Sequence, residues 1–501
     1  MDAFTAAPDT LPGVLERAAA RFPDAAALVE GTRTTSYAAL LEAARAAGAG
    51  LAELGVMPGD RVGIWLPNGT DWAVAAYGAS FAGAAVVPLS TRYTEPEAAG
   101  IITRSGCAAV VAHGRLLGRD LGLAAARAGA PRVVDAARLA ETGRTRGGAE
   151  IERRARALTA DTISHVQYTS GTTGRPKGVL LRHGGLVATT RSWVEITGLR
   201  AGDRYPVVAP FAHVGGHKTG LLASAVAGAT ALPVARFDAA ELAAACAGGG
   251  VTFLQGPPAM YRALLAEGLP PSHAVRVAVT GAASVPADLV RGLRETLGIR
   301  TVLTAYGITE AGGVCTMTRA TDPPEAAVRT AGRAIPGVRV RIGGTGGPGE
   351  ILVQGPGLMA GYLDDPDATA GALRDGWLRT GDVGVLDEHG RLRVVDRLTD
   401  VVIVGGLNVY PAEVERVLTE HPAVRAAAVV GMPDDRLGEV PAAFVVPDTG
   451  PDHEVLAFCR ERLAAYKLPR ALWWVDDLPL NGAGKVAKRE LRARAAAGPP
   501  P

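Results

Sequence analysis

Apolar and polar positions in the first part of the chain alternate between two periods, which predicts helices and strands in turn. Residues 11–20 and 37–54 carry apolar side chains at intervals of three and four, the spacing of an amphipathic helix. Short apolar runs at 61–66 and 84–89 predict buried strands, with a helical segment at 72–81 between them. This order predicts a parallel sheet with helices on both faces.

The strand pattern recurs at 107–112 and again after residue 204. Residues 115–159 are rich in Arg and Ala with weak periodicity, and we expect them to form a surface excursion. Residues 219–235 are rich in Gly and Ala and contain Pro233, so they predict a buried helix running into a strand rather than a membrane span. The later strand candidates are 205–209, 251–254, 275–280 and 301–304.

From residue 338 the pattern changes. Gly343 to Gly349 form a turn cluster, and the alternating segments beside it predict a small antiparallel barrel. A compact α+β module follows at 401–497, with helices expected at 411–421 and 454–465.

Composition narrows the class of protein. A chain of 501 residues exceeds the size of one hydrophobic core, so two or more domains are expected. The net charge is +2 and the arginines are scattered, which argues against a nucleic-acid surface. The four cysteines lie far apart without metal-ligand spacing, and acidic residues precede the first apolar run. Both features favour a reducing cytoplasm and no secretory signal.

The most specific motif is residues 168–178, which follow the apolar–polar run 163–168. It contains three glycines, three threonines, a serine and Lys177. Such a loop can turn sharply and direct backbone N–H groups, hydroxyls and a cation at phosphate oxygens. It is not a Walker A loop, because no Gly-Lys-Ser/Thr closes it. A flexible polar linker is the alternative, but a linker does not require this composition.

This loop resembles the phosphate loop of the adenylate-forming superfamily, which includes acyl-CoA synthetases, peptide-synthetase adenylation domains and beetle luciferases. Further segments match motifs of that family and occur in the same order along the chain. Their sequences most resemble those of acyl-CoA ligases. They are 306–310, 379–382, 396–397, 405–415 and 481–485.

The resemblance implies an α/β fold with two domains. Residues 1–397 would form a large N-terminal domain of parallel-sheet αβαβα layers plus a small β-barrel-like part. Residues 398–501 would form a small, mobile α+β domain that carries the catalytic lysine. The family's hinge position is occupied here by Thr399.

The resemblance also implies ATP and Mg²⁺. Tyr306 would stack on adenine, Thr309 would contact the α-phosphate, and Glu310 would hold Mg²⁺, which prefers carboxylate oxygens. Asp382 could accept from both ribose hydroxyls, whereas Arg397 either contacts the nucleotide or pairs with Asp396 or Asp400. The expected ATP-binding set is Thr169, Ser170, Gly171, Thr172, Thr173, Gly174, Lys177, Gly281, Ala282, Ala283, Thr304, Ala305, Tyr306, Gly307, Thr309, Asp382, Val394, Arg397 and Lys485.

The catalytic residues that the resemblance implies are Lys485, Glu310, Thr309 and His213. An ammonium placed at Lys485 would stabilise the negative charge that concentrates at the α-phosphate, whereas an ordinary solvated tail lysine is the alternative. His213 matches a position that gates the carboxylate site in the family.

The acid pocket is expected to include Phe211, His213, Val214, Gly215, His217, Lys218, Ser284, Ala311 and Gly312. We hypothesise that Lys218 or His217 meets a polar or second acidic group of the substrate; a snorkelling surface lysine is the alternative. Gly405 and Gly406 would line the CoA tunnel.

The sequence therefore predicts ATP-dependent activation of a small-molecule carboxylic acid, followed by thioester formation with CoA. Adenylation of a carboxylate or of an anion such as nitrite, with transfer to a carrier protein or amine, stays open, as does a nucleotide-binding regulatory relative. We expect no nucleic-acid partner, no membrane span, a cytoplasmic location and, as one option, a homodimer.

Overall fold

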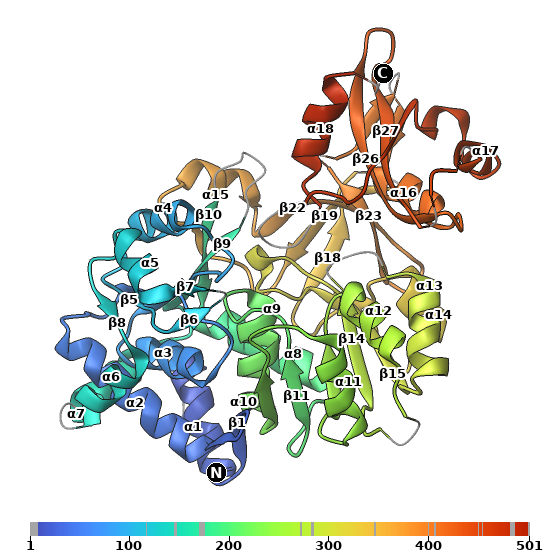
Figure 1. Ribbon diagram of the computed structural model, residues 1–501. Coiled ribbons are helices and arrows are strands. Elements are labelled where there is room, and N and C mark those ends of the chain that lie inside the picture. The colour runs from blue at the N-terminus through green and yellow to red at the C-terminus, as the bar shows by residue number, and fades with distance from the viewer. Residues whose placement is uncertain are drawn as a thin grey trace. The chain divides into compact units, whose positions relative to one another are not determined.

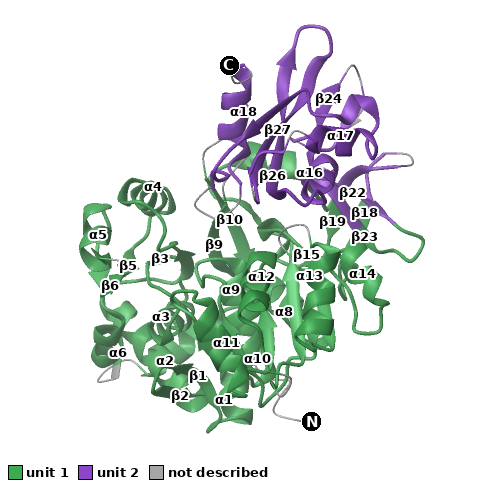
Figure 2. Cartoon of the chain, turned by 45° about the vertical axis from the view of Figure 1, so that its right-hand side comes forward, with its two compact units in different colours: residues 1–341, 352–379, 387–392 green, residues 342–351, 380–386, 393–501 purple. Residues whose placement is uncertain are grey.

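The computed structural model describes residues 9–498 except 117, 145–147, 170–175, 271–272, 282–284, 345–346, 399, 405–406, 449, 453 and 481–485, and it describes only the backbone of residues 144 and 408. The chain divides into two compact units, which Figure 2 shows in different colours. Unit 1 contains residues 1–341, 352–379 and 387–392; unit 2 contains 342–351, 380–386 and 393–501.

A nine-stranded sheet forms one half of unit 1. Its order is β17-β16-β15-β14-β13-β11-β12-β1-β2, and the run from β15 to β1 is parallel, whereas the edge strands are antiparallel. The strands are β1 (Ala26–Glu30), β2 (Arg33–Ser36), β11 (Arg204–Val207), β12 (Thr230–Pro233), β13 (Phe253–Gln255), β14 (Val277–Gly281), β15 (Thr301–Tyr306), β16 (Thr316–Met317) and β17 (Arg333–Ala334).

A seven-stranded sheet forms the other half, in the order β20-β10-β9-β4-β3-β5-β8. The run from β9 to β8 is parallel, whereas β10 is antiparallel to both β9 and β20. The strands are β3 (Arg61–Ile64), β4 (Ala85–Pro88), β5 (Ala109–Val111), β8 (Val133–Val134), β9 (Ile163–Thr169), β10 (Lys177–Arg182) and β20 (Gly361–Tyr362). The short hairpin strands β6 (Arg115–Leu116) and β7 (Arg119–Asp120) pair with each other.

Helices pack on both sheets, as Figure 1 shows. Leu242, Tyr261 and Leu289 of α11, α12 and α13 pack in one cluster with residues of β13, β14 and β15, and α4 and α5 pack in a second cluster with β4, β5 and β9. The parallel αβ architecture expected from the sequence is thereby confirmed. The helices of unit 1 are α1 (Leu11–Arg21), α2 (Tyr37–Glu53), α3 (Thr70–Phe81), α4 (Glu95–Ser105), α5 (Leu121–Arg127), α6 (Ala136–Arg144), α7 (Gly148–Ala157), α8 (His183–Thr197), α9 (Val214–Gly216), α10 (Ala223–Ala227), α11 (Ala239–Ala247), α12 (Pro258–Glu267), α13 (Ala287–Arg291), α14 (Pro324–Arg329) and α15 (Pro366–Ala372), with π-helical turns at His217–Leu222 and Gly292–Thr296.

The expectation of a surface excursion at 115–159 is wrong for part of that segment. Strand β8 extends the seven-stranded sheet, and α6 packs closely against α2. A Cβ on Gly143 would lie 1.8 Å from the carbonyl oxygen of Ala46, and one on Gly50 would lie 2.3 Å from that of Leu139. The close approach of α6 to α2 depends on single glycines, and β8 is only two residues long. Neither feature produces a hydrophobic period in the sequence, so the pattern of apolar residues does not predict it.

The segment expected as a small barrel is a five-stranded sheet whose residues are divided between the units. Its order is β18-β19-β22-β21, with β23 paired to β22. The strands are β18 (Arg339–Ile342), β19 (Gly349–Gln354), β21 (Leu373–Arg374), β22 (Trp377–Leu386) and β23 (Leu392–Arg397). The domain boundary after residue 397 stays a prediction.

The rest of unit 2 is the expected α+β module. Its sheet runs β25-β24-β27-β26, with β28 paired to β27. Helix α17 ends at Arg460, five residues earlier than expected. The elements are β24 (Val402–Val404), β25 (Leu407–Val409), α16 (Pro411–Thr419), β26 (Val424–Asp434), β27 (Gly438–Pro447), α17 (Val455–Arg460), β28 (Ala471–Trp474) and α18 (Lys488–Ala496).

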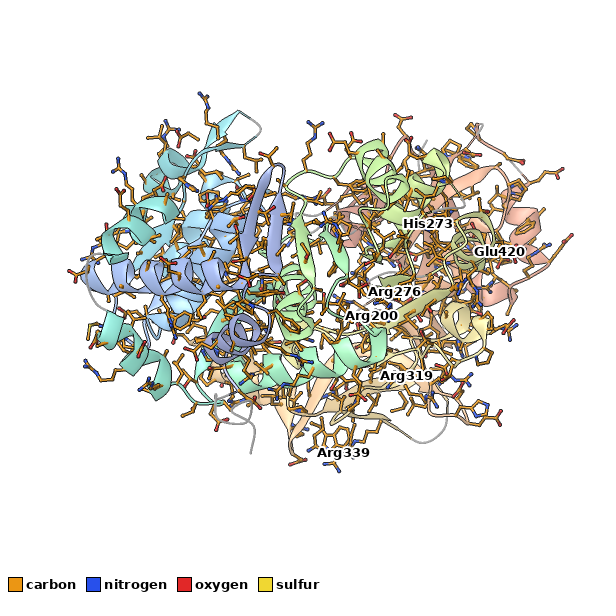
Figure 3. All side chains as sticks on the ribbon, turned by 90° about the horizontal axis from the view of Figure 1, so that it is seen from below. Arg200, His273, Arg276, Arg319, Arg339 and Glu420 are labelled. Atoms are coloured by element: carbon orange, nitrogen blue, oxygen red, sulfur yellow. The ribbon has the colours of Figure 1, made fainter. Side chains whose placement is uncertain are left out.

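Buried Asp203 joins the amino ends of three parallel strands. Its carboxylate accepts from Thr252 Oγ1 at 2.8 Å, from Arg276 Nε at 3.1 Å and from the Arg200 backbone N–H at 2.9 Å. Asp203, Thr252 and Arg276 immediately precede β11, β13 and β14, and Figure 3 shows Arg200 and Arg276 next to each other. The carboxyl ends, where open α/β sheets bind ligands, therefore lie at the opposite edge.

All four cysteines, Cys107, Cys246, Cys315 and Cys459, are buried and free. Burial raises the pKa of the Cys107 and Cys246 thiols to about 12. None of the described helices combines the length and the apolar character needed to cross a membrane.

Candidate active site

Glu310 lies at the carboxyl end of β15, in the 3-10 turn Thr309–Ala311. Its Oε1 accepts a hydrogen bond of 3.0 Å from the phenol of Tyr362. Burial and the nearby Glu310 carboxylate raise the pKa of Tyr362, so the phenol stays protonated and donates. The ammonium of Lys177 lies 5.0 Å from the centroid of the same ring.

Strand pairing explains this cluster. Tyr362 on β20 pairs with Val179 on β10, and Lys177 is the first residue of β10. Lys177 is also paired in register with Thr169, the last residue of β9. The expected phosphate loop thus connects two antiparallel strands, although Ser170, Gly171, Thr172, Thr173 and Gly174 lie outside the described residues.

The segment from Tyr306 to Cys315 folds back on itself after β15. The Cys315 N–H donates to the Tyr306 carbonyl at 2.8 Å. A Cβ on Gly307 would lie 2.3 Å from the Gly313 carbonyl oxygen, so this close approach requires glycine. Thr309 and Ala311 are buried in the turn, and Gly312 ends it at a φ of 73°.

The neighbouring strand ends contain the other residues expected around adenine. A Cβ on Gly281 would lie 2.5 Å from the Ala305 carbonyl oxygen, so β14 and β15 end in close contact. The buried Thr304 hydroxyl donates to the Thr330 carbonyl at 2.9 Å. Ala282, Ala283 and Ser284 lie outside the described residues, and the role of Thr304 stays a prediction.

Within unit 2, Arg397 pairs with Asp382 at 3.2 Å between Nε and Oδ1. The Asp382 side chain is 8% exposed and that of Arg397 is 52% exposed, so the carboxylate is fixed while the guanidinium reaches solvent. The guanidinium is thus in an ion pair, as the alternative expected, but with neither of the expected partners: Asp396 accepts from the Arg397 backbone N–H, and Asp400 accepts from Arg492 at 2.6 Å.

Asp396 connects Arg397 to the beginning of α16. It accepts from the Arg397 N–H at 2.7 Å and from the Ala412 N–H at 2.8 Å. Burial raises its pKa despite these bonds and the nearby Lys488. Val394, expected beneath the nucleotide, is 39% exposed.

In unit 1, two buried amides hold the segment expected to bind the acid. The Asn68 side chain donates to the carbonyls of Val207 and Ala209 at 3.0 and 2.9 Å and accepts from the Phe211 N–H at 2.6 Å. Gln167 on β9 donates to the Ala212 carbonyl at 3.0 Å. Both amides tie the seven-stranded sheet to the loop after β11.

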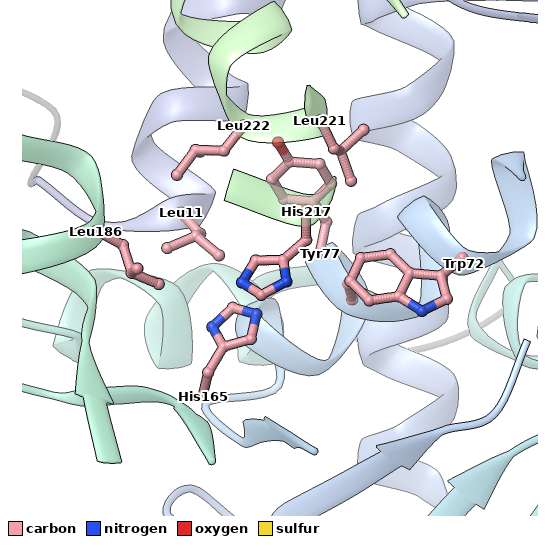
Figure 4. A pocket seen from close by; sticks show the side chains of 9 residues that line it. Leu11, Trp72, Tyr77, His165, Leu186, His217, Leu221 and Leu222 are labelled. Atoms are coloured by element: carbon pink, nitrogen blue, oxygen red, sulfur yellow. The ribbon is translucent and has the colours of Figure 1, made fainter. Parts of the chain in front are cut away.

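Two histidines stack beneath this segment. The rings of His217 and His165 are 4.4 Å apart and nearly parallel, and Figure 4 shows Trp72 beside them. His217 Nδ1 donates to the Phe211 carbonyl at 3.0 Å, which leaves Nε2 as the acceptor. Burial lowers the pKa of His217 to about 3 and that of His165 well below its usual value, so both rings are neutral.

The cavity beside these rings has a volume of about 10 Å³, room for about one water molecule. It is therefore too small to bind an acid. His213 is exposed, and its Nδ1 accepts from the Gly215 N–H at 3.0 Å at the beginning of α9. Val214 is buried there and Phe211 is wholly buried against Trp72.

Lys218 is wholly buried in the π-helical turn that follows α9. The alternative of a snorkelling surface lysine is therefore wrong. Burial lowers its pKa to about 7, and within the described part of the chain its Nζ makes no hydrogen bond. Such π turns are frequent at functional sites.

No group of three or more His, Cys, Asp or Glu side chains among the described residues could hold a metal ion by itself. Mg²⁺ commonly binds through one or two carboxylates together with substrate phosphates, so Glu310 alone fits such a role. Lys485, Gly405, Gly406 and Thr399 lie outside the described residues.

Sequence reasoning missed Tyr362, Asn68, Gln167 and His165. Tyr362 follows a glycine in a segment without periodicity, and Asn68 precedes Gly69, which is the signal of a turn. Gln167 and His165 lie in the apolar–polar run 163–168, which by itself predicts no role for either side chain.

The comparisons with known proteins agree with this geometry. Residues 15–363 match the AMP-binding enzyme family, and residues 413–485 match the AMP-binding enzyme C-terminal domain. The chain is 44% identical to 3-[(3aS,4S,7aS)-7a-methyl-1,5-dioxo-octahydro-1H-inden-4-yl]propanoyl:CoA ligase of Mycobacterium tuberculosis, covering 96% of this chain and 98% of that protein. It is 41% identical to the protein of the same name in Rhodococcus jostii, covering 98% and 99%.

A solved relative extends the agreement to the fold. The o-succinylbenzoate CoA synthetase of Bacillus subtilis, in complex with its acyl-adenylate intermediate, superposes with a TM-score of 0.86 at 29% identity over 96% of this chain and 97% of that one. Its complex with ATP and magnesium gives a TM-score of 0.85. The chain therefore belongs to the AMP-binding enzyme family, within the adenylate-forming superfamily.

Proposed function

We propose that this chain is an AMP-forming acid–CoA ligase. A carboxylate attacks the α-phosphorus of ATP to give an acyl-adenylate and pyrophosphate, and the CoA thiol then displaces AMP to give the thioester. The observation that carries the proposal is the cluster of Glu310, Tyr362 and Lys177 at the carboxyl end of β15. A fixed carboxylate for a cation and an ammonium for phosphate are the charges that this chemistry needs.

The residues of unit 1 supply positioning and charge. Tyr362 holds the Glu310 carboxylate in one orientation, and Mg²⁺ bound there would neutralise phosphate charge. Lys177 would bind the departing pyrophosphate. The roles of Asp382, Arg397, Lys485, Gly405 and Gly406 stay predictions, as do a homodimer and a cytoplasmic location.

We propose a cyclic acid with a short carboxylic side chain as the substrate class. Two relatives at 44% and 41% identity are named as ligases of a bicyclic dioxo propanoic acid, which supports this choice.

The test supplies Mg-ATP and a panel of carboxylic acids, with and without CoA, and measures pyrophosphate, AMP and thioester. We expect AMP only with an accepted acid and thioester only when CoA is added. AMP without thioester in the presence of CoA would favour a carrier protein or an amine as acceptor. No pyrophosphate with any acid would overturn the proposal.

Two variants sharpen the assay. Glu310→Gln removes the negative charge with little change in shape, and Lys485→Ala removes the expected ammonium. We expect each to lower the rate of pyrophosphate release by about 10²–10³-fold. Lys467→Ala is the matched control, because Lys467 is another lysine of unit 2, partly buried and paired with Glu413 at 2.7 Å.

A further inference from the structure

One buried amine in unit 1 lacks any partner that the described residues supply. Lys218 has an exposed fraction of 0%, and its Nζ makes no hydrogen bond within the described ranges. A lysine amine taken out of water without a partner is costly. The fold therefore keeps this amine at a cost to its own stability, which is a common property of functional residues.

The neighbouring residue of the same turn shows the contrast. Thr219 Oγ1 donates to the Gly215 carbonyl at 2.6 Å and accepts from Gln255 Nε2 at 2.9 Å, and Gln255 Oε1 accepts from the Tyr205 phenol at 2.6 Å. These bonds fix the π-helical turn. The unpartnered amine thus belongs to a rigid segment rather than to a loosely packed one.

The position of Lys218 connects it to the candidate active site. It interacts electrostatically with Cys315, whose N–H donates to the Tyr306 carbonyl at 2.8 Å. Just before this turn, Val214 lies so close to Gly313 that a Cβ on the glycine would be 2.8 Å from the valine Cγ2. The helical segment that carries Lys218 therefore packs beside residues 313–315, which follow Glu310.

We propose that Lys218 binds an oxygen acceptor that the acid carries away from the carboxylate to be activated, either a ring ketone or a second carboxylate. The inference rests on the proposed function and deepens it, because it names the substrate class. The amine can donate a hydrogen bond in both protonation states, and as an ammonium it also attracts an anion. An acid without this oxygen leaves the amine unpaired, so the site rejects it.

The test compares three matched acids: a cyclohexylpropanoic acid, the same acid with a ring ketone, and the same acid with a ring carboxylate. We expect the wild type to prefer at least one of the two oxygen-bearing acids over the plain acid by about ten-fold or more in kcat/KM. Preference for the carboxylate that weakens as the pH rises through 7 would identify an anion, whereas preference for the ketone at all pH values would identify a neutral acceptor.

Lys218→Met keeps the length of the side chain and removes the amine. We expect it to lower kcat/KM for the preferred acid by about ten- to a hundred-fold and not to lower it for the plain acid, so that the preference disappears. Lys218→Gln, which retains a donor, should keep part of the preference. Thr219→Val is the matched structural control, because a general disturbance of the turn lowers kcat/KM for all acids in equal proportion.

A binding measurement separates recognition from turnover. Acyl-sulfamoyl adenosines made from the plain acid and from the preferred oxygen-bearing acid bind without reacting, and calorimetry gives their dissociation constants with wild type and Lys218→Met. Equal losses for both ligands in the variant, or equal binding of all acids by the wild type, would overturn the proposal. A wild type that ligates the plain acid without discrimination would leave the proposed function standing.

Discussion

The phenol of Tyr362 donates a 3.0 Å hydrogen bond to Glu310 from a strand of the other sheet of unit 1. Glu310 follows β15 of the nine-stranded sheet, whereas Tyr362 lies on β20 at the edge of the seven-stranded one. The carboxylate proposed to bind the cation is therefore oriented by both halves of the unit.

Tyr362→Phe should weaken the binding of Mg-ATP, because it removes the group that orients the Glu310 carboxylate. Loss of the bond leaves the Glu310 carboxylate free to rotate, and a hydrogen bond to a charged group contributes about 1.5–3 kcal/mol. We expect KM for Mg-ATP to rise about ten-fold. Tyr261→Phe is the control, since it removes the phenol that donates to the Val279 carbonyl at 3.0 Å in the core; an equal rise in KM there would contradict the prediction.

Arg397→Met should affect nucleotide binding more than stability. The guanidinium is half exposed, and exposed ion pairs contribute only about 0–1 kcal/mol to folding. We expect the free energy of unfolding to change by less than about 1 kcal/mol while KM for ATP rises about ten-fold. Arg416→Met breaks an exposed pair with Glu420 in the same unit and should leave KM unchanged.

Lys218→Met should stabilise the protein and change how its stability depends on pH above 7. The folded pKa of about 7 lies below the ordinary 10.5, so between these values the unfolded chain binds a proton that the folded chain lacks. The free energy of unfolding therefore rises with pH from about 7 to 10.5. Below pH 7 the buried amine is protonated in the folded chain too, and it destabilises the fold by its full amount. We expect a higher melting temperature at pH 7 and a flatter slope above it; a lower melting temperature of the variant would contradict this.

His183→Asn should reduce the loss of stability in acid. Burial lowers the pKa of His183 to about 3, while its Nδ1 accepts from the Leu11 N–H at 3.2 Å. As the pH falls below 6.5, the imidazole takes up a proton in the unfolded chain but not in the folded one. Between pH 6.5 and pH 5 this ring therefore lowers the free energy of unfolding by about 2 kcal/mol. Chemical denaturation at pH 7 and pH 5 measures the difference, and His389→Asn at an exposed position should leave it unchanged.

Much of the architecture follows from local patterns. The apolar runs before Tyr306 and Gly281 mark buried parallel strands, and side chains at their carboxyl ends meet because parallel strands end at one edge. The resemblance then gave Glu310 its expected role. No local pattern indicated that β20, the edge strand of the seven-stranded sheet, supplies a hydrogen-bond donor to the Glu310 loop, which follows a strand of the nine-stranded sheet.

Tyr362 illustrates that limit. Its strand is two residues long and becomes a strand only because β10 lies beside it, so its function depends on tertiary pairing. Asn68 has the same character, since an Asn-Gly pair predicts a turn, while its three bonds to residues 207–211 depend on a neighbouring sheet. The sequence marks Lys218 as unusual, but only its burial in the structure distinguishes a buried amine from a surface one.

The burial of every cysteine has a practical consequence. Thiolates are the reactive form, and the raised pKa of Cys107 and Cys246 keeps those two protonated at neutral pH. A colorimetric disulfide reagent added to the native enzyme should therefore titrate free coenzyme alone. Disappearance of that colour would record thioester synthesis continuously, without any background from the catalyst itself.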